Sequence, residues 1–450
     1  MSSPHRLTAL RAISRDSAVF AVTSALIACP TVAAVTGNLF VSSVIFLVIS
    51  GFLSLLVILE SLSSGWGLSF GPAADLGQAR SVTIIVCAYL PNEQGLILDT
   101  VSELLAAVSD MPNVQIILSY RSPRDLQVEE ELRAVALRHP SLCLLNVTTG
   151  NGKAEQLNQA IDRATGEVVY LLDADAMPDR WTIRRVPFIL SEQVDVVQGR
   201  NMIRNTGHLI GKIVAVEFAA KYMVSHLARS RLAALAYFCG SNCIWRLGVA
   251  RATRFSNASL VEDVEASVRA DLNGSKIVID PTFATTELAP ECLVDWWRQR
   301  RRWAQGWLEV GRLHTAAICS QSRFSLWKKV NWIYVIYGRR VGYALMSFGL
   351  LGTSLLLLLG GDGRGAVFLG SFVVVQLMTG ITQAGAVAVQ ASRLGEKRLP
   401  LSWCLVYGFT YPLYDVLKNA VTIAAIAASV VGIRDWRITP RRRPACLEEQ

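Results

Sequence analysis

Five long apolar runs, gathered in two groups, set the strongest constraint on how this chain can fold. Two lie near the N-terminus and three in the last third of the chain: Ala18–Thr36, Leu39–Leu62, Trp332–Leu359, Ala366–Ala391 and Leu401–Val431. About 20 consecutive apolar residues are enough for a helix to cross the hydrocarbon core of a bilayer. The whole chain is 52% hydrophobic and only 18% charged, too apolar for an ordinary soluble protein. The sequence therefore predicts a multi-pass membrane protein with one large aqueous domain between two groups of spans.

The charges beside the apolar runs predict the orientation of the chain. Arg6, Arg11 and Arg15 precede the first run, whereas the Gly37-Asn38 link to the second run carries no charge. Because basic residues are enriched on the cytoplasmic side, we expect the N-terminus and the aqueous domain in the cytosol, at the plasma (inner) membrane. The second run follows the first without an evident cleavage site, which favours a retained hairpin over a signal peptide.

The net charge of +9 and the nine cysteines exclude some classes of partner and site. Much of the basic charge lies beside the apolar runs, as expected for contact with membrane lipid headgroups and nucleotide phosphates, and no nucleic-acid partner is expected. The cysteines are scattered, and Cys239 and Cys243 lack the partners and spacing of a zinc site. We expect unpaired thiols on a reducing, cytosolic side.

Between the two groups of spans, strand patterns alternate with helix patterns. The predicted strands are Val82–Ala88, Val114–Leu118, Leu142–Asn146, Val168–Leu172 and Val194–Gln198; the predicted helices are Asn92–Ser109, Asp125–Arg138, Lys153–Ala164 and Asp263–Leu272. This alternation indicates an α/β domain with a parallel, doubly wound sheet. We divide the chain into an N-terminal hairpin and linker (1–80), the α/β domain (81–290), amphipathic interfacial helices (291–330) and a C-terminal membrane bundle with a basic tail (331–450).

Two carboxylates follow one of the buried strands. Val168–Leu172 leads directly into Asp173 and Asp175, and Pro178 is expected to stop the strand. The carboxyl ends of parallel strands face the ligand crevice of such a sheet. Mg²⁺ and Mn²⁺ are hard cations, and one or two carboxylates together with substrate phosphates suit them. An Asp-x-Asp alone occurs by chance in many chains, so its position at a strand end is what favours a metal site.

Three shorter stretches are weaker candidates for a site. Gly150-Asn-Gly-Lys153 lies just before a helix, where amides and a lysine meet phosphate, although it lacks the P-loop spacing. Phe238–Asn242 places small residues where a backbone can approach a ligand closely. Glu262 and Asp263 open a helix, and acidic residues there also stabilise the helix dipole. From the residues alone, the capping interpretation of this pair is as good as a catalytic one.

The stretch Leu293–Trp307 combines tryptophans with a run of arginines. Plotted as a helix, one face holds apolar residues, namely Leu293, Trp297, Ala304, Trp307 and Gly311. This pattern is typical of an amphipathic helix in the membrane interface. The remaining groups, Gln299, Arg302 and Trp303, also offer hydrogen-bond donors and an aromatic ring suited to a diphosphate and a sugar.

Taken in order, an Asp-x-Asp, a Glu-Asp before a helix and a Gln-x-x-Arg-Trp resemble the membrane glycosyltransferases of family 2. The chain looks similar to the cellulose, chitin and hyaluronan synthases, over about Val82 to Trp307 by motif and over the flanking spans by layout. Asp-Ala-Asp alone is a weak signal, but the three motifs in this order between spans are specific. The resemblance implies a cytosolic α/β domain of the GT-A (Rossmann-like) fold, inserted between transmembrane α-helices.

The resemblance also implies roles for individual residues. Asp173 and Asp175 would hold a divalent cation, Mg²⁺ or Mn²⁺, and Asp263 would be the general base with Glu262 beside it. Nucleotide-sugar contacts are expected from Asn92, Glu93, Lys153 and Asp173; acceptor and diphosphate contacts are expected from Gly240, Ser241, Asn242, Gln299, Arg301, Arg302 and Trp303. One departure concerns the base: many relatives carry an aspartate just after the second strand, where this chain reads Leu118-Ser-Tyr-Arg-Ser-Pro123. The identity of the nucleotide is therefore less constrained than the metal site.

The resemblance implies an inverting transferase that uses a nucleotide sugar, with UDP expected, to elongate a β-linked polysaccharide. One alternative is transfer of a single sugar to a lipid acceptor, as in ceramide glucosyltransferase-like proteins; the length of the product discriminates. A second alternative is a non-enzymatic transporter or scaffold, which three intact motifs disfavour.

The last apolar run carries polar groups that a simple anchor does not need. Tyr411-Pro412 is expected to break its helix, and Asp415, Lys418 and Asn419 follow. Ionisable groups inside a membrane usually face a bundle interior or a water-filled path. By resemblance, that path would carry the polysaccharide outward. A final segment bent at Pro412 would also return the basic tail, Arg437–Arg443, to the cytosol.

Overall fold

The computed structural model describes residues 35, 37–65, 79–150, 152–433 and 439–440. The chain forms two compact units. The sheet unit comprises Ser64–Gln299, Val389–Leu399 and Arg437–Gln450, and the helical unit comprises Met1–Ser63, Arg300–Ala388 and Pro400–Trp436. The first expected span, Ala18–Thr36, lies almost wholly outside the described residues. The seven described cysteines carry free thiols, as expected from their scatter.

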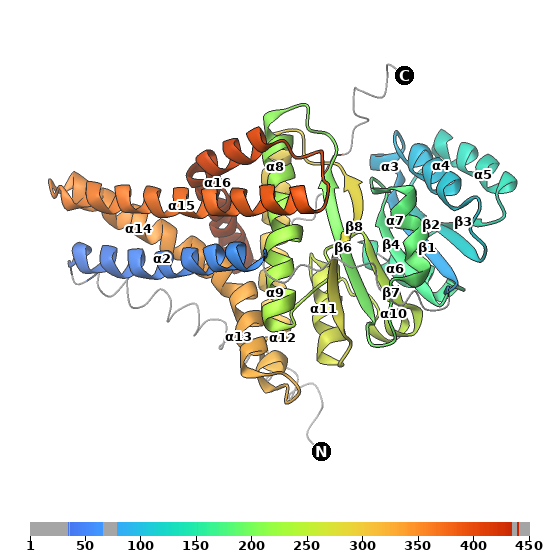
Figure 1. Cartoon of the computed structure of the whole chain (residues 1–450), viewed down its shortest axis with the longest axis horizontal. Helices are drawn as coiled ribbons and strands as arrows, with labels where there is room; N and C mark the ends of the chain where they lie inside the picture. The colour runs from blue at the N-terminus through green and yellow to red at the C-terminus, as the bar shows by residue number, and fades with distance from the viewer. Residues whose placement is uncertain (1–34, 36, 66–78, 151, 434–438, 441–450) are drawn as a thin grey trace. The chain divides into compact units, whose positions relative to one another are not determined.

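The sheet unit is built on eight strands in the order β3-β2-β1-β4-β7-β6-β8-β5. Their bounds are β1 Val82–Tyr89, β2 Val114–Arg121, β3 Leu142–Asn146, β4 Val168–Asp173, β5 Met177–Pro178, β6 Val196–Ile203, β7 Cys243–Arg246 and β8 Ile277–Glu287. The four strands β1 to β4 pair in parallel, and β6 pairs in parallel with β8. Figure 1 labels these strands, apart from the two-residue β5.

The predicted parallel pairing is correct for β1 to β4 but does not extend across the whole sheet. Strand β7 is antiparallel to both of its neighbours, β4 and β6, and β5 is antiparallel to β8. Strand β7 has only four residues and is almost entirely buried, so its sequence resembles that of any buried strand. Nothing in such a pattern reports the direction of pairing, because direction depends on the path of the preceding chain.

Helices cover both faces of the sheet, and each face has its own apolar core. One core includes Ile84 and Val86 of β1 and lies against α4 (Ile97–Val108), α5 (Gln127–Arg138) and α7 (Arg180–Arg185). The other includes Ile85 of β1 and lies against α6 (Gly152–Arg163), α10 (Leu247–Thr253) and α11 (Glu262–Leu272). Because alternate residues of β1 enter opposite cores, the strand is apolar at nearly every position.

The expected helix Asn92–Ser109 is two helices, α3 (Leu90–Glu93) and α4. Leu96 has φ −132° and ψ −17°, so the chain leaves the helical conformation between them. Gly95 in this link has a low helix propensity, which favours the interruption. The sheet unit also contains a helical stretch that the sequence did not predict: α8 (Leu209–Ala219), the π-helical turn η2 (Ala220–Ser225) and α9 (His226–Ala233), besides the short 3₁₀ turn η1 (Val186–Phe188).

The segment Val389–Leu399, which comprises the end of α15 (Arg364–Arg393) and the residues after it, belongs to the sheet unit. A guanidinium nitrogen of Arg200 in β6 is 3.1 Å from a carboxylate oxygen of Glu396. Both side chains are buried, so this is an ion pair largely shielded from water. Gln390 also donates a hydrogen bond to the carbonyl of Ser64 at 2.7 Å. These contacts attach the segment to the sheet unit.

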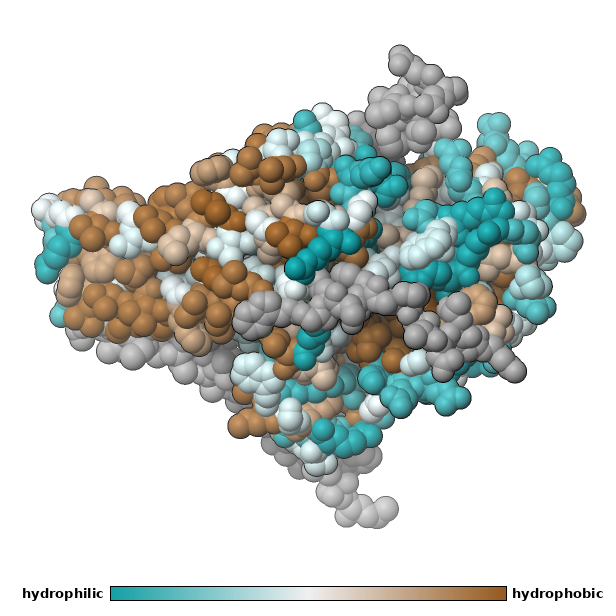
Figure 2. Space-filling model, in the orientation of Figure 1, coloured by the Kyte–Doolittle hydropathy of each residue, from teal (hydrophilic) through white to brown (hydrophobic). Residues whose placement is uncertain are grey.

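Among the residues that the structure describes, four stretches are candidate membrane spans, and they lie largely in the helical unit. They are α2 (Leu39–Ser63); the stretch Leu326–Leu359, which combines α13 (Leu326–Ile333), η3 (Tyr334–Gly342) and α14 (Tyr343–Leu359); α15 (Arg364–Arg393); and α16 (Leu401–Val430). Each is long and apolar enough to cross a bilayer, as the sequence predicted for these four. Figure 2 shows apolar residues gathered on the visible faces of these helices.

The expectation that Pro412 breaks the last helix was wrong, because α16 continues through it. Proline cannot donate to the carbonyl four residues earlier, here that of Gly408. Membrane helices tolerate this loss where a neighbouring helix packs against the freed group. Here α15 comes very close: a Cβ on Gly380 would lie 2.7 Å from the Gly408 oxygen.

The helix α12 (Leu293–Ser320) begins as predicted, and part of its apolar face is buried inside the protein. Ala304, Trp307 and Gly311 are buried as expected, whereas Leu293 is 50% exposed. Trp296, not Trp297, is the fully buried tryptophan of the pair. Neighbouring residues point about 100° apart on a helix, so two adjacent tryptophans leave the choice of buried ring to packing.

Candidate active site

The candidate site lies at the carboxyl ends of β1 and β4. Strand β4 ends at Asp173, which is in register with Cys87 of β1. Lys153, in the first turn of α6, makes an ion pair with the Asp173 carboxylate. The same ammonium group donates to the carbonyl of Gly240 at 2.6 Å and lies 3.9 Å from a carboxylate oxygen of Glu262. Lys153 therefore joins the three sequence motifs that contribute Asp173, Gly240 and Glu262.

Burial and nearby charges set the protonation of this cluster. Burial opposes the charged form of Lys153, but the carboxylates of Asp173 and Glu262 outweigh it and raise the lysine pKa, so the ammonium stays charged. Burial raises the pKa of the Cys87 thiol to about 12, although Lys153 acts in the opposite direction. The Cys87 thiol is therefore neutral at ordinary pH. Because the thiolate is the reactive form, Cys87 is a poor nucleophile.

The turn Gly240–Asn242, just before β7, lines one side of the site, and we call this turn the floor of the site. Gly240 has φ +96°, which a residue with a side chain rarely adopts, and Ser241 Oγ accepts a hydrogen bond from the Asp173 amide at 3.0 Å. Both polar atoms of the Asn242 side chain form hydrogen bonds within the protein. Oδ1 accepts from the Tyr170 hydroxyl at 2.8 Å, and Nδ2 donates to the Arg200 carbonyl at 2.9 Å. Asn242 therefore braces β4 against β6 from inside the sheet unit.

Asp263 lies beside this turn, at the start of α11. A Cβ placed on Gly240 would be only 3.3 Å from the Asp263 carboxylate, so glycine leaves this carboxylate room. Burial, followed by the charge of Glu262, raises the pKa of Asp263 to about 7. A carboxyl group that titrates near neutral pH is suited to accept a proton from a hydroxyl.

The second carboxylate of the Asp-x-Asp lies deeper. Asp175 is buried, and its side chain accepts a hydrogen bond from the Leu288 amide at 3.0 Å. Its own carbonyl accepts from Arg204 at 2.6 Å. These bonds connect the end of β4 to the end of β8. Arg204 directly follows β6 and was not among the site residues expected from the sequence.

The donor set around Asp173 fits a hard cation that shares its ligands with substrate phosphates. The Asp173 side chain is 33% exposed, and Asp175 follows two residues later. Within the described ranges, no group of three or more His, Cys, Asp and Glu side chains is placed to hold a metal ion. Mg²⁺ and Mn²⁺ do not need such a cage, because water and phosphate oxygens complete their coordination.

The residues expected near the nucleotide lie at the end of β1. The Asn92 amide donates to Glu93 at 2.9 Å and to the carbonyl of Thr439 at 3.1 Å. Glu93 also accepts from the Tyr89 amide. Arg121, the last residue of β2, lies in the stretch where the family's aspartate is missing, and it donates to the carbonyl of Gly150 at 2.6 Å. An arginine therefore holds the loop that leads to Lys153.

The Gln-x-x-Arg-Trp motif lies in α12, where the two units meet along the chain. Gln299 is the last residue of its segment of the sheet unit, while Arg301, Arg302 and Trp303 belong to the helical unit. Within the helical unit, the guanidinium of Arg300 lies 4.4 Å from the centre of the Trp303 ring. Arg340 lies 3.7 Å from the Trp307 ring. Both tryptophans thus carry a cation on one face.

Comparison with known proteins gives a family match and a fold match. The family described as Glycosyltransferase like family 2 matches residues 79–306, just over half of the chain. Poly-beta-1,6-N-acetyl-D-glucosamine synthase of Staphylococcus aureus is 24% identical over 285 residues, 60% of this chain and 67% of that protein. The Staphylococcus epidermidis synthase of the same name is 24% identical over 273 residues, 58% of this chain and 64% of that protein.

A mannosyltransferase from Pyrobaculum calidifontis, solved in complex with GDP-Man and Mn²⁺, superposes with a TM-score of 0.60 at 18% identity. The match covers 87% of this chain and 99% of that one. This likeness shows a shared fold. The expected GT-A fold, with flanking apolar helices, is confirmed.

Proposed function

Since the chain belongs to glycosyltransferase family 2 and is a glycosyltransferase, we propose that it elongates a β-linked polysaccharide of N-acetylhexosamine units from a UDP-linked sugar. The relatives named poly-beta-1,6-N-acetyl-D-glucosamine synthases support this choice of sugar. The observation that carries the proposal is the cluster in which Lys153 joins Asp173 to Glu262, beside the buried Asp263. Carboxylates and the ammonium group of Lys153 are thus gathered at the carboxyl ends of strands, where sheets of this kind bind their ligands.

The donor side of the reaction needs positive charge. The glycosidic bond to a diphosphate breaks with negative charge growing on the leaving group. Asp173 and Asp175 would hold a divalent cation, which would supply Lewis-acid stabilisation of that charge. Lys153 stays protonated and contributes a fixed positive charge beside Asp173. Asn92 and Glu93 would contact the nucleotide.

The acceptor side needs a base. Asp263 would take the proton of the attacking hydroxyl, an effect typically worth about 10²–10⁴-fold in rate. Glu262 keeps the pKa of Asp263 high through its negative charge. With one base and no second nucleophile assigned, the hydroxyl displaces the leaving group directly. The anomeric centre is inverted, so an α-linked donor gives a β-linkage.

The remaining parts of the proposal concern the acceptor and the membrane. Gln299, Arg301, Arg302 and Trp303 would bind the diphosphate and the growing glycan end, with Gly240 and Ser241 lining the acceptor side. The sheet unit would lie on the cytosolic face, and the spans would pass the polymer outward. The charge pattern before the first apolar run supports this orientation.

Purified protein in detergent or nanodiscs, given UDP-N-acetylglucosamine, tests the proposal. We expect UDP release that requires Mg²⁺ or Mn²⁺, stops with a chelator, and yields a β-linked polymer. Asp263→Asn is the matched inactive control. A single sugar on lipid would identify the ceramide glucosyltransferase-like alternative instead. No UDP release with any nucleotide sugar would overturn the assignment of this site.

A further inference from the structure

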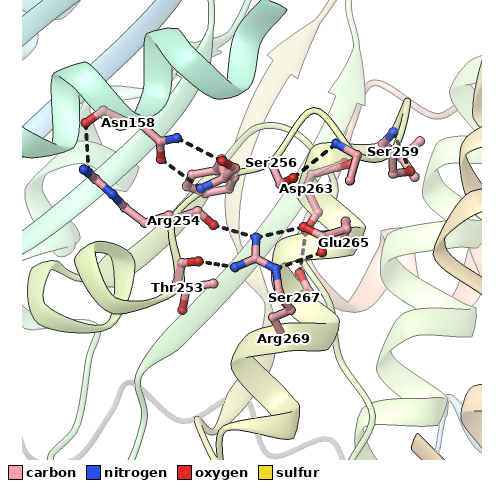
Figure 3. A network of polar contacts seen from close by, with 12 residues as sticks. Asn158, Thr253, Arg254, Ser256, Ser259, Asp263, Glu265, Ser267 and Arg269 are labelled. Carbon is pink, nitrogen blue, oxygen red and sulfur yellow. Dashed lines mark hydrogen bonds and ion pairs between the residues drawn. The ribbon is translucent and has the colours of Figure 1, made fainter. Parts of the chain in front are cut away.

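The loop Arg254–Val261 leads directly into the acidic pair and is held by side chains from two helices. It forms neither helix nor strand. A loop of this kind has many conformations unless its backbone groups are bonded. Since the loop ends where Glu262 and Asp263 begin, whatever fixes it also fixes these two carboxylates. Figure 3 shows the polar contacts around it.

The first anchor is Asn158 of α6. Its Oδ1 accepts a hydrogen bond from the Phe255 amide at 2.8 Å, and its Nδ2 donates to the Phe255 carbonyl at 2.9 Å. One side chain thus satisfies both backbone groups of one loop residue, which requires a donor and an acceptor at the same reach. The Phe255 ring is buried, with its centre 5.8 Å from that of Trp245.

The second anchor is Arg269 of α11, the helix that carries the acidic pair. Its guanidinium makes two hydrogen bonds of 2.8 Å to the Glu265 carboxylate. It also donates to the carbonyl of Thr253 and, at 2.7 Å, to that of Arg254. Glu265 is almost wholly buried, so this forked pair is shielded from water. It fixes the start of the loop to α11, six residues after Asp263.

A third contact fixes the turn of Asp263 itself. Ser267 Oγ donates to the Asp263 carbonyl at 2.8 Å and accepts from the Phe238 amide at 2.7 Å. Phe238 stands two residues before Gly240, so this serine ties the acidic pair to the turn whose carbonyl binds Lys153. The positions of Glu262 and Asp263 are therefore fixed relative to both α6 and the turn before β7.

The arrangement on α6 connects these anchors to the donor side. Lys153 and Asn158 lie on the same helix, whose residues Ala154, Leu157 and Ala160 enter the core against the sheet. A helix packed in this way is a rigid element. Lys153 at its start contacts Asp173 and Glu262, while Asn158 in its middle clamps the loop.

We propose that Asn158 is a positioning residue, which fixes the distance between the base Asp263 and the donor-side charges by clamping the loop Arg254–Val261 to α6. This inference rests on the proposed function, because it assumes that Asp263 is the base. It assigns Asn158 no contact with the substrate. By fixing Asp263, the clamp keeps the acceptor hydroxyl oriented towards the donor. Loss of the clamp should therefore lower kcat.

The decisive comparison is Asn158→Ala against Asp162→Ala. Asp162 lies one turn further along α6 and pairs with Arg254 of the same loop at 2.6 Å, but both side chains are about half exposed. An exposed pair contributes little, so Asp162→Ala should leave kcat and donor KM within about twofold of wild type. Asn158→Ala should lower kcat roughly 10-fold to 100-fold, the range that a misplacement of about 1 Å produces, with donor KM unchanged within about twofold.

A conservative variant and a second measurement separate positioning from folding. Asn158→Gln keeps both the acceptor for the Phe255 amide and the donor to its carbonyl, at a longer reach, so its kcat should lie between wild type and Asn158→Ala. Hydrogen exchange should show faster exchange of amides 255–263 in Asn158→Ala, while amides of β1 and β4 keep their protection.

The outcomes distinguish this inference from the proposed function. Unchanged kcat in Asn158→Ala, or a rise in donor KM that matches the fall in kcat, overturns the positioning role. Failure of both Asn158 variants to accumulate as folded protein also overturns it, in favour of a purely structural residue. If the loop amides loosen as expected but wild-type protein transfers no sugar, the proposed function fails and the clamp stands.

Discussion

At the residue scale, the burial of Asp263 has a direct consequence for the pH dependence of the enzyme. The groups that face it are Glu262, Lys153 and Lys221, and burial with the charge of Glu262 raises its pKa to about 7. Above this pH Asp263 is ionised and can accept a proton; below it the base is already protonated. We expect kcat/KM to fall about tenfold per pH unit below roughly pH 7, as measured by UDP release. A flat profile from about pH 5 to 8 would contradict the role of Asp263.

The same burial predicts a change in stability when the charge is removed. The folded pKa of Asp263, about 7, is raised above its ordinary value of 3.8, so the folded state binds the proton more tightly than the unfolded state. Stability therefore falls as the pH rises from about 4 to about 7, and the cost is fully present above pH 7.

Asp263→Asn should consequently lose turnover, keep donor binding, and melt at a higher temperature than wild type at pH 8. At pH 4 the folded carboxyl is protonated and most of this cost is absent, so the two proteins should melt at nearly the same temperature. Asp162→Asn, a change at an exposed carboxylate, is the control for both pH values. A lower melting temperature of Asp263→Asn at pH 8 would mean that its charge stabilises the fold.

At the element scale, two of the strands that the sequence predicted, β1 and β4, are buried on both faces. Val82–Ala88 and Val168–Leu172 end within one residue of the observed strands, because continuous apolar runs mark them. Strand β8 was missed, since Asp280-Pro281 reads as a turn. In the structure these residues fall at a register shift, between the pairs Gln198↔Ile279 and Arg200↔Ala284, where proline needs no ladder partner.

The candidate site was predictable in type but not in its connections. Acidic motifs at a strand end and at a helix start can be read from single residues. That Lys153 bonds Asp173, and that Asn158 holds the loop before Asp263, depends on how α6 packs across the sheet. Asn158 lies in a helix, and the sequence alone does not show that its side chain forms hydrogen bonds to a distant loop.

Helix α12 allows a test that separates a glycan contact from a packing role. Trp307 is buried under Arg340, whereas Trp303 is partly exposed and carries Arg300 on one face. Trp303→Ala should reduce polymer formation strongly, with little change in donor binding or detergent stability. Trp307→Ala should lower stability, by about 3–5 kcal/mol if the ring is as well packed as in a core, and spare the activity of protein that still folds. Equal loss of stability in both variants, with normal elongation in Trp303→Ala, would make Trp303 a packing residue.

At the scale of the whole molecule, the helical unit depends on close helix contacts made by glycine. A Cβ on Gly380 would lie 2.3 Å from the Cβ of Tyr411, beside the carbonyl that Pro412 leaves without its usual donor. Gly380→Ala should therefore separate α15 from α16 and lower the melting temperature in detergent. Gly385 lies on the same helix with no such neighbour within 4 Å, so Gly385→Ala should be neutral or stabilising, by up to about 1 kcal/mol. Equal effects of the two changes would refute a close crossing at Gly380.

The ion pair between Arg200 and Glu396 implies that the sheet unit completes its folding late in the synthesis of the chain. The two residues are 196 positions apart, so a ribosome delivers the arginine long before its partner. Until the segment Val389–Leu399 emerges, a nascent sheet unit holds a guanidinium that its finished interior would bury. Removing one member of a buried pair typically costs about 3–5 kcal/mol. A fragment that ends at residue 306 should thus be markedly less stable than the same fragment with residues 389–399 rejoined through a linker, and maturation of the sheet unit should wait for the late helices.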